Sequence, residues 1–291
     1  MKVGMECYIC LLERAIRAAM MITNDNNLIL KVANRIASFL VDNFNLDAVP
    51  AILGTQRERI IMETLGVDDL YREIKIKSNE VARNVAEEVF GSLSYDDYSY
   101  ENFRKFMVLA AAANSMEWFI RGHEFSLDMF KEKMLGAMEN LVIDESRGLY
   151  ELIKGKRVLY ILDNAGEAVI DLYVVKYLRG MVKSITMAAR SKPILNDVTV
   201  DELIKLGAEE YCDNIVAVGD FVGVIFEWAT DEFKEAFDKS ELVIAKGMGA
   251  YESITEYKLD KPTYVILTAK CMRIARDLGV QQGKLVIKRI A

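Results

Sequence analysis

Oxygen-bearing side chains follow an apolar run near the middle of the chain. The run "RVLYIL" (157–162) ends in Asp163, Asn164, Ala165, Gly166 and Glu167, after which a helical pattern begins. One interpretation is a helix cap, with Asn164 as N-cap and Glu167 three positions later, as in a capping box. The other is a ligand site built from carboxylate and amide oxygens. This cluster alone does not decide between them.

A second polar cluster follows the run at 184–189, in the segment "RSKPILNDVTVDEL". A helix is expected to begin near Thr199, and its N-cap needs one Asp, Asn, Ser or Thr. The segment instead supplies Arg190, Lys192, Asn196 and Asp197 together. Two cations and an acid on one loop suit a phosphate held beside a metal ion.

A third cluster begins where Lys246 ends an apolar run and Gly247 and Gly249 follow. Glycines at such a position let backbone N–H groups approach an anion closely. A dinucleotide fingerprint would place a third glycine where Glu252 stands, and it would lie in the first strand–helix turn of its domain. We therefore favour a phosphate site over a nucleotide-cofactor site.

The three strand ends together supply oxygen ligands and cations: Asp163, Asn164, Asp197, Lys192 and Lys246. Carboxylate and amide oxygens suit divalent metals such as Mg²⁺, Mn²⁺ or Co²⁺. The single histidine of the chain excludes a His-rich zinc site. A dehalogenase-type phosphatase would need a second aspartate where Ala165 stands, so we expect attack by a metal-activated water and not by Asp163. The pattern indicates metal-assisted hydrolysis of a phosphate ester.

The elements that must position these residues follow two different periods. Apolar residues recur every three to four positions from residue 6 to about 150, which predicts an all-α region over 1–154. Five short β-type runs follow Gly155, with amphipathic stretches between several of them: 157–162, 184–189, 241–245, 263–267 and 284–288. This alternation predicts an α/β domain over 155–291 with a mostly parallel sheet. In such sheets, ligands bind beyond the carboxyl ends of the strands.

Composition restricts the partners. The chain has 291 residues and a net charge of −7, which disfavours unspecific binding to nucleic acid. No stretch reaches the roughly 20 apolar residues of a membrane helix, and the N-terminal pattern is an amphipathic helix that does not suit a signal peptide. Four cysteines form no disulfide framework. We expect a cytoplasmic protein without membrane or nucleic-acid partners, and the oligomeric state stays open.

Four segments carry a family resemblance: "CYICLLERA", "DNAGE", "RSKPILNDVT" and "KGMGAYE". They resemble, in the family's order, the short prokaryotic and archaeal branch of the metal-dependent damage-control phosphatases, formerly a domain of unknown function. The match runs from Cys7 to about Cys271. It implies a helical region packed on a Rossmann-like domain with the site at their junction. It also implies hydrolysis of phosphorylated metabolites, including sugar phosphates, with Co²⁺, Ni²⁺, Mn²⁺ or Mg²⁺.

The resemblance extends to individual residues. It implies that Asp163, Asn164 and Asp197 bind the metal and that Lys246 is catalytic on the phosphate side. The segment "AAANSMEWF" resembles the family's Gly-Asn-x-x-Asp segment, with Ala113 in place of glycine and Glu117 in place of aspartate. A carboxylate across the cleft, Glu117 or Glu167, is expected to orient the water. The expected substrate-binding residues are Asn114, Arg190, Lys192, Gly247 and Gly249.

The remaining candidates are less specific. Cys7 and Cys10 form one C-x-x-C, which would be a structural zinc pair, a redox pair or a buried reduced pair. Tyr71, Lys75 and Asn79 share one helix face, for which we favour a solvated surface. Arg57 and Arg59 are also expected on a solvated face. His123 is expected in a loop or interface.

Two other functions compete with a phosphatase. A non-catalytic module that binds a phosphorylated metabolite for regulation would need the anion site without the metal. The clustered acids disfavour it, because they repel a phosphate unless a cation lies between them. A methyltransferase would need a glycine-rich loop after the first strand, whereas "DNAGE" has one glycine.

Overall fold

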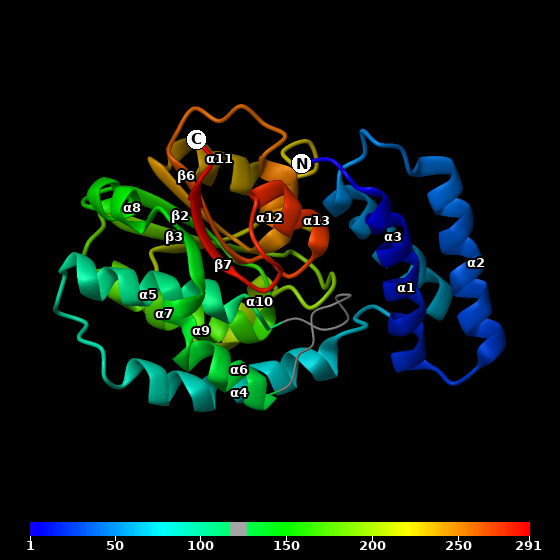
Figure 1. Ribbon diagram of the computed structural model, residues 1–291, viewed down its shortest axis with the longest axis horizontal. Coiled ribbons are helices and arrows are strands. Elements are labelled where there is room, and N and C mark those ends of the chain that lie inside the picture. Colours follow the sequence, from blue (N-terminus) through cyan, green and yellow to red (C-terminus); the bar gives the residue numbers. More distant parts are fainter. Residues whose placement is uncertain (117–126) are drawn as a thin grey trace.

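The computed structural model describes residues 1–116 and 127–291. Three helices at the N-terminus pack together at one end of the molecule (Figure 1): α1 (Met5–Ile22), α2 (Asn26–Asn43) and α3 (Pro50–Leu65). Their shared core includes Ala15, Ile36 and Ile61, which are fully buried. No helix in the described residues is both long and apolar enough to span a membrane.

The local sequence explains where these helices begin and end. The Asp25 carboxylate accepts a hydrogen bond from the Asn27 N–H and caps α2. Pro50 occupies the first turn of α3, where a missing N–H costs nothing. Gly66 ends α3 in the left-handed conformation at φ 68°.

Seven strands in the described part of the chain form one sheet. Its strands are β1 (Leu141–Asp144), β2 (Arg157–Ile161), β3 (Ser184–Ala189), β4 (Asn214–Ala217), β5 (Leu242–Lys246), β6 (Thr263–Thr268) and β7 (Leu285–Arg289). Their order is β1-β7-β6-β5-β2-β3-β4. Neighbouring strands of this sheet run parallel, except that β6 and β7 run antiparallel.

Helices cover both faces of the sheet. On one face, α4 (Arg72–Phe90), α5 (Tyr100–Ala113) and α9 (Ala165–Leu178) share a core with the sheet, and α6 (Leu127–Leu135), α7 (Ala137–Asn140) and α8 (Ser146–Ile153) complete this layer. On the other face lie α11 (Asp231–Lys239), α12 (Gly247–Ile254) and α13 (Met272–Leu278). The short α10 (Val200–Lys205) and a 3₁₀ turn (Ala208–Glu210) connect β3 to β4. Figure 1 shows α9 and α12 on opposite sides of the strands.

The predicted fold class is confirmed, and the five predicted runs all form strands. The prediction that 1–154 is entirely helical is wrong at 141–144, where β1 pairs parallel with β7. The sequence pattern also gave no indication of β4. Both strands are four residues long and partly exposed, so neither shows a continuous apolar run. The predicted domain boundary at residue 154 stays a prediction. The rings of Phe106 and Tyr177, which come from either side of that boundary, stack with their centroids 4.0 Å apart.

Candidate active site

The predicted site lies at the carboxyl ends of two neighbouring strands whose following helices cover opposite faces of the sheet. Strand β2 leads into α9 on one face, whereas the neighbouring β5 leads into α12 on the other. Ligands of open α/β sheets bind at such a switch point, beyond the carboxyl ends of the strands. Asp163 follows β2, and Gly247 follows β5 directly opposite. A Cβ atom on Gly247 would lie only 1.9 Å from Asp163 Oδ2.

The segment after β2 turns its polar side chains inward. Asn164 occupies the N-cap position of α9, but its side chain makes no capping hydrogen bond. Its Nδ2 instead donates to Asp163 Oδ2 at 3.0 Å and to Glu167 Oε2 at 3.1 Å. Asp163, Asn164 and Glu167 are 6%, 2% and 0% exposed. The capping-box interpretation is therefore wrong for this cluster, whereas at α10 Thr199 and Glu202 do form one.

A second amide, from the helical half of the chain, contacts the same carboxylates. Asn114 follows the last turn of α5, and its Nδ2 donates to Asp163 Oδ2 at 2.9 Å and to Glu167 Oε2 at 2.7 Å. Its Oδ1 accepts from the Thr268 N–H at 3.1 Å. The end of β6 therefore sets the orientation of Asn114. Two amides from distant parts of the chain thus bridge the same pair of acids.

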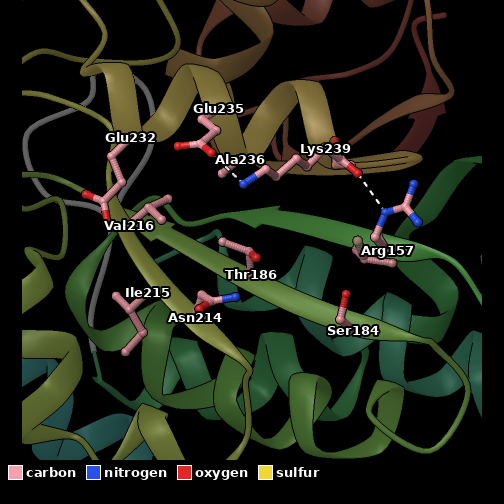
Figure 2. A pocket seen from close by; sticks show the side chains of 12 residues that line it. Arg157, Ser184, Thr186, Asn214, Ile215, Val216, Glu232, Glu235, Ala236 and Lys239 are labelled. Atoms are coloured by element: carbon pink, nitrogen blue, oxygen red, sulfur yellow. Dashed lines mark hydrogen bonds and ion pairs between the residues drawn. The ribbon is translucent and has the colours of Figure 1, made fainter.

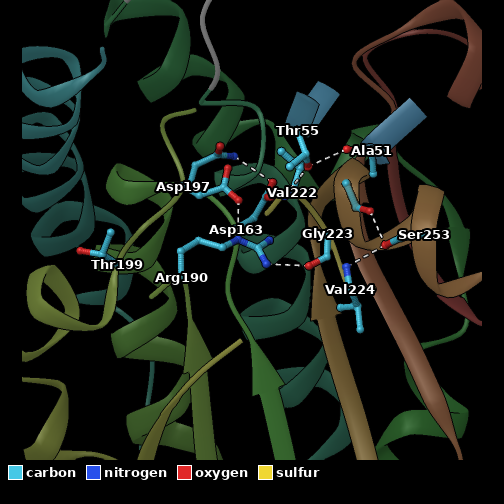
Figure 3. Close-up of polar contacts among 12 residues, drawn as sticks. Ala51, Thr55, Asp163, Arg190, Asp197, Thr199, Val222, Gly223, Val224 and Ser253 are labelled. Atoms are coloured by element: carbon cyan, nitrogen blue, oxygen red, sulfur yellow. Dashed lines mark hydrogen bonds and ion pairs between the residues drawn. The ribbon is translucent and has the colours of Figure 1, made fainter. Parts of the chain in front are cut away.

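The loop after β3 brings Asp197 to the cluster. The Val198 N–H donates to the Asp163 carbonyl oxygen at 2.9 Å, and Asn164 and Asp197 form an isolated antiparallel bridge. Arg190 Nε donates to Asp197 Oδ2 at 2.7 Å, and Arg190 Nη1 donates to the Gly223 carbonyl oxygen at 2.6 Å (Figure 3). Arg190 is buried and bonded to protein groups. It therefore positions Asp197, whereas a substrate-binding role for it stays a prediction.

Lys246 lies between two buried carboxylates of α9. Its Nζ is 2.6 Å from Glu167 Oε1 and 2.6 Å from Asp171 Oδ1. Burial alone would lower the pKa of Lys246, but the two carboxylates outweigh it and raise the pKa above its ordinary value. Burial raises the pKa of Asp171 to about 6, against the opposing charge of Lys246.

Sequence reasoning missed Asp171 and its second partner. The Tyr160 hydroxyl donates to Asp171 Oδ1 at 2.7 Å. The available signal was one acid inside the apolar stretch "AVIDLYVV", one helical turn after Glu167.

The glycines after β5 allow elements to approach closely. Gly247 has φ 82°, a conformation that side chains rarely adopt, and it faces Asp163. A Cβ atom on Gly249 would lie 2.8 Å from Val222 Cγ1 in the neighbouring loop. Their proposed contact with a phosphate anion remains a prediction.

Other predicted residues lie elsewhere. Lys192 is exposed and lines a surface groove with Arg59 and Asp220, so the structure does not bring it to the buried cluster. Glu117 and His123 lie outside the described residues.

The predicted solvated face around Lys75 is wrong, and the one predicted for Arg57 and Arg59 is wrong at Arg57, whereas the Arg59 side chain is partly exposed. Lys75 is buried and pairs with Asp69 and Glu202 at 2.8 and 2.7 Å. Arg57 is also buried, and its Nε donates to Glu58 Oε1 at 2.9 Å.

All four cysteines are free thiols. Cys7 lies in the first turn of α1, where its Sγ accepts from the Gly4 N–H at 3.5 Å. Cys7, Cys10 and Cys271 line the same cavity. Within residues 1–116 and 127–291, no group of three or more His, Cys, Asp or Glu side chains is arranged to hold a metal ion. The role of Cys7 and Cys10 stays open.

The cluster nevertheless suits a cation by charge and donor type. The predicted ligand set, Asp163, Asn164 and Asp197, consists of two carboxylates and one amide, which suit divalent metals. The carboxylates of the cluster are Asp163, Glu167, Asp171 and Asp197, and its basic side chains are Arg190, Lys246 and Lys270. Among the described residues, these carboxylates outnumber the basic side chains by one. A bound cation would offset this excess negative charge.

Two further hollows lie at opposite ends of the strands. A groove of about 310 Å³ lies beside α11, over the first residues of β2, β3 and β4 (Figure 2). Its charged groups bond to one another, since Arg157 donates to the Lys239 carbonyl oxygen and Lys239 pairs with Glu235. A cavity of about 390 Å³ lies beside the cluster, between α1, α3 and the loops at the carboxyl ends of the strands. The second is the better candidate for a substrate cavity.

Comparison with known proteins agrees with this arrangement. Residues 3–286 match the family described as "Damage-control phosphatase ARMT1-like domain". A protein of Archaeoglobus fulgidus named damage-control phosphatase is 31% identical and covers 99% of each chain. Damage-control phosphatase PH1575 of Pyrococcus horikoshii is 34% identical over 99% of this chain and 98% of its own. A crystal structure of that DUF89 family protein superposes with a TM-score of 0.89 and 32% identity, covering both chains completely. The chain therefore belongs to the damage-control phosphatase ARMT1-like family.

Proposed function

We propose that this protein is a divalent-metal-dependent phosphomonoesterase that hydrolyses small phosphorylated metabolites by direct attack of water. Membership of a damage-control phosphatase family supports phosphatase activity on damaged metabolites. The metal dependence and the route of attack are our inferences. The observation that carries them is the buried cluster in which Asp163, Asn164 and Asp197 meet beside Lys246. Sugar phosphates are the substrate class that the family resemblance implies.

The residues of the chain divide the work in this proposal. A divalent ion held by Asp163, Asn164 and Asp197 would offset phosphate charge and lower the pKa of a bound water. The Lys246 ammonium group stabilises negative charge on the phosphoryl oxygens, and Glu167 and Asp171 hold that ammonium group in place.

The contacts of the acids favour water as the nucleophile. Asp163 Oδ2 already accepts from Asn114 and Asn164, and these hydrogen bonds lower the nucleophilicity of that oxygen. Both oxygens of Glu167 are also engaged, one by Lys246 and one by the amides. The water-orienting carboxylate is therefore better assigned to Glu117 than to Glu167.

The first test is metal-dependent turnover in a conservative variant. Asp197→Ala is a poor choice, because it would leave the buried Arg190 uncompensated at a cost of about 3–5 kcal/mol. Asp197→Asn keeps the shape and removes the charge. We expect it to lose nearly all metal-stimulated phosphate release while staying folded with a lowered thermal unfolding midpoint, because Arg190 loses its counter-charge but keeps a hydrogen-bond acceptor. Asp220→Asn, which removes a carboxylate from an exposed ion pair with Arg59, is the matched control and should keep full activity. Undiminished turnover in Asp197→Asn, or in excess chelator, would refute the proposal.

The route of attack has its own test. In a single turnover in heavy-oxygen water, with enzyme in excess, direct attack puts the label into the released phosphate and none into the protein. Label in Asp163 after repeated turnovers would establish a covalent intermediate instead. A metabolite-binding module without catalysis would bind phosphate esters in the presence of metal and release no phosphate.

A further inference from the structure

The cavity between α1, α3 and the strand-end loops is lined in part by chain neighbours of the site residues. Its volume, about 390 Å³, falls in the range of small-molecule sites. Three of its wall residues are close chain neighbours of site residues. Leu195 lies two positions before Asp197, Met248 follows Gly247, and Val222 precedes the Gly223 carbonyl group that holds Arg190. An ester whose phosphate lies at the cluster would therefore extend its organic group into this cavity.

The wall of the cavity is mainly hydrocarbon and sulfur. Its aliphatic part includes Leu11, Pro50, Ala51 and Val222. Three thiols, those of Cys7, Cys10 and Cys271, face the same space. Burial raises the pKa of Cys7 to about 11 and that of Cys271 to about 12, so these two thiols are neutral at ordinary pH. Neutral thiols behave as small apolar groups.

The polar wall residues already have protein partners. Four of these pairings are Arg57 with Glu58, Glu6 with Arg276, Arg273 with Asp277, and Gln282 with the Lys270 carbonyl oxygen. Arg14 and Glu252 also interact with other groups of the chain. A polyhydroxylated ligand would have to compete with these pairings for part of its hydrogen bonds, and each hydroxyl group left unsatisfied is unfavourable.

We propose that this cavity binds the organic group of the substrate and selects phosphate esters whose organic part is predominantly hydrocarbon over sugar phosphates. The inference rests on the proposed phosphatase function. It narrows the substrate class to amphiphilic phosphomonoesters with a small, mainly hydrocarbon organic group.

Gly54 gives a direct way to test the cavity. It lies on α3 in the cavity wall, and among the described residues nothing lies within 4 Å of a Cβ atom built on it. Gly54→Leu therefore adds a side chain to the cavity wall whose Cβ atom meets no described neighbour. Ser38→Leu, which places the same side chain on an exposed position of α2, is the matched control.

The measurement is kcat/KM, with the activating metal, for methyl phosphate, hexyl phosphate and fructose 1-phosphate. All three release an alcohol, so differences in leaving group are small. We expect the natural protein to favour hexyl over methyl phosphate by about tenfold or more, as burial of methylene groups requires, and to favour hexyl over fructose 1-phosphate. Gly54→Leu should raise the KM for hexyl phosphate and so abolish most of the preference for hexyl over methyl phosphate. Ser38→Leu should retain that preference.

The outcomes separate this inference from the proposed function. A higher kcat/KM for fructose 1-phosphate than for hexyl phosphate would overturn the inference and leave the phosphatase function standing. An unchanged hexyl preference in folded Gly54→Leu protein, checked by circular dichroism, would also overturn it. Absence of metal-dependent turnover of every ester would overturn the proposed function and the inference together.

Discussion

The buried ion pairs around Lys246 are the residue-scale feature that most affects the chemistry. The Lys246 ammonium group is fully buried, and it has partners on both sides, Glu167 and Asp171. Asp171 in turn accepts from the Tyr160 hydroxyl. Because Asp171 does not touch the predicted metal ligands in any described contact, it acts as a positioning residue for Lys246.

The raised pKa of Asp171 predicts a pH effect on activity. With a pKa of about 6, Asp171 is ionised at neutral pH and becomes protonated as the pH falls through 6. Lys246 then loses one of its two charged anchors, so kcat should fall in that window. Asp171→Asn should lower kcat by about tenfold, as the loss of an outer-shell partner often does, and remove this acid limb.

The check is a profile of kcat and KM from pH 5 to 9 for both proteins. Asp213→Asn, at an exposed ion pair with Arg179, serves as the control and should keep the natural profile. An acid limb near pH 6 that persists unchanged in Asp171→Asn would assign the titration to another group.

At the scale of elements, the site depends on how tightly two strand ends approach each other. Gly247 at the start of α12 faces Asp163 at the end of β2 with no room for a Cβ atom. The loop after β3 is also constrained, since Leu195 adopts φ 48°, which is unusual for a residue other than glycine. Leu195 is held there by its place in the core of the three N-terminal helices. Packing of those helices therefore helps to set the position of Asp197.

Gly247→Ala tests the close approach against a control with the same backbone conformation. Gly207 has φ 83°, nearly equal to the 82° of Gly247, but a Cβ atom there meets nothing within 4 Å among the described residues. Gly207→Ala should therefore cost only the left-handed backbone strain, about 1–2 kcal/mol. Gly247→Ala should cost more and should also lose activity, because it displaces Asp163. The check is the thermal unfolding midpoint and the turnover of both variants. Equal losses in Gly247→Ala and Gly207→Ala would argue against the tight contact between Gly247 and Asp163.

At the scale of the whole molecule, the three-helix unit and the sheet share a core. Ile194, Leu195 and Val222 come from loops at the carboxyl ends of the strands, yet they are buried in the same core as side chains of the three N-terminal helices. The Val222 N–H donates to the Thr55 hydroxyl at 3.0 Å (Figure 3). The helical unit is thus part of the framework that holds the site loops.

The reactivity of Cys7 and Cys271 shows whether the three N-terminal helices stay packed against the sheet. Burial raises the pKa of Cys7 to about 11 and of Cys271 to about 12, so little reactive thiolate is present at pH 8. We expect iodoacetamide to alkylate these two cysteines far more slowly in the native protein than in the same protein unfolded in urea. Peptide mass spectrometry gives the rate at each site. Native rates equal to the unfolded rates would mean that the helical unit opens freely from the sheet.

The sequence alone determined the five longer strands, the polar clusters after three of them and the family. Buried strands need continuous apolar runs, and polar residues directly after such a run lie at the carboxyl edge of a parallel sheet. The positions of Asp163 and Asn164 at the carboxyl edge of the sheet therefore follow from the residue pattern, whereas Asp197 lies eight residues after the end of β3 and also depends on the packing of its loop. The short edge strands β1 and β4 lack that signal, because they are half exposed and only four residues long.

Tertiary structure decided which charged residues are buried and what each one contacts. Lys75 was expected on a solvated face, yet it pairs with Glu202, far along the chain. The Arg190 guanidinium group holds Asp197 and Gly223, contacts that the sequence did not reveal, and its predicted role in substrate binding stays a prediction. Periodicity reports which face of an element is apolar, but a charged side chain is buried only when another element brings it a partner. That partner is chosen by the packing of distant segments, which the local pattern of residues does not encode.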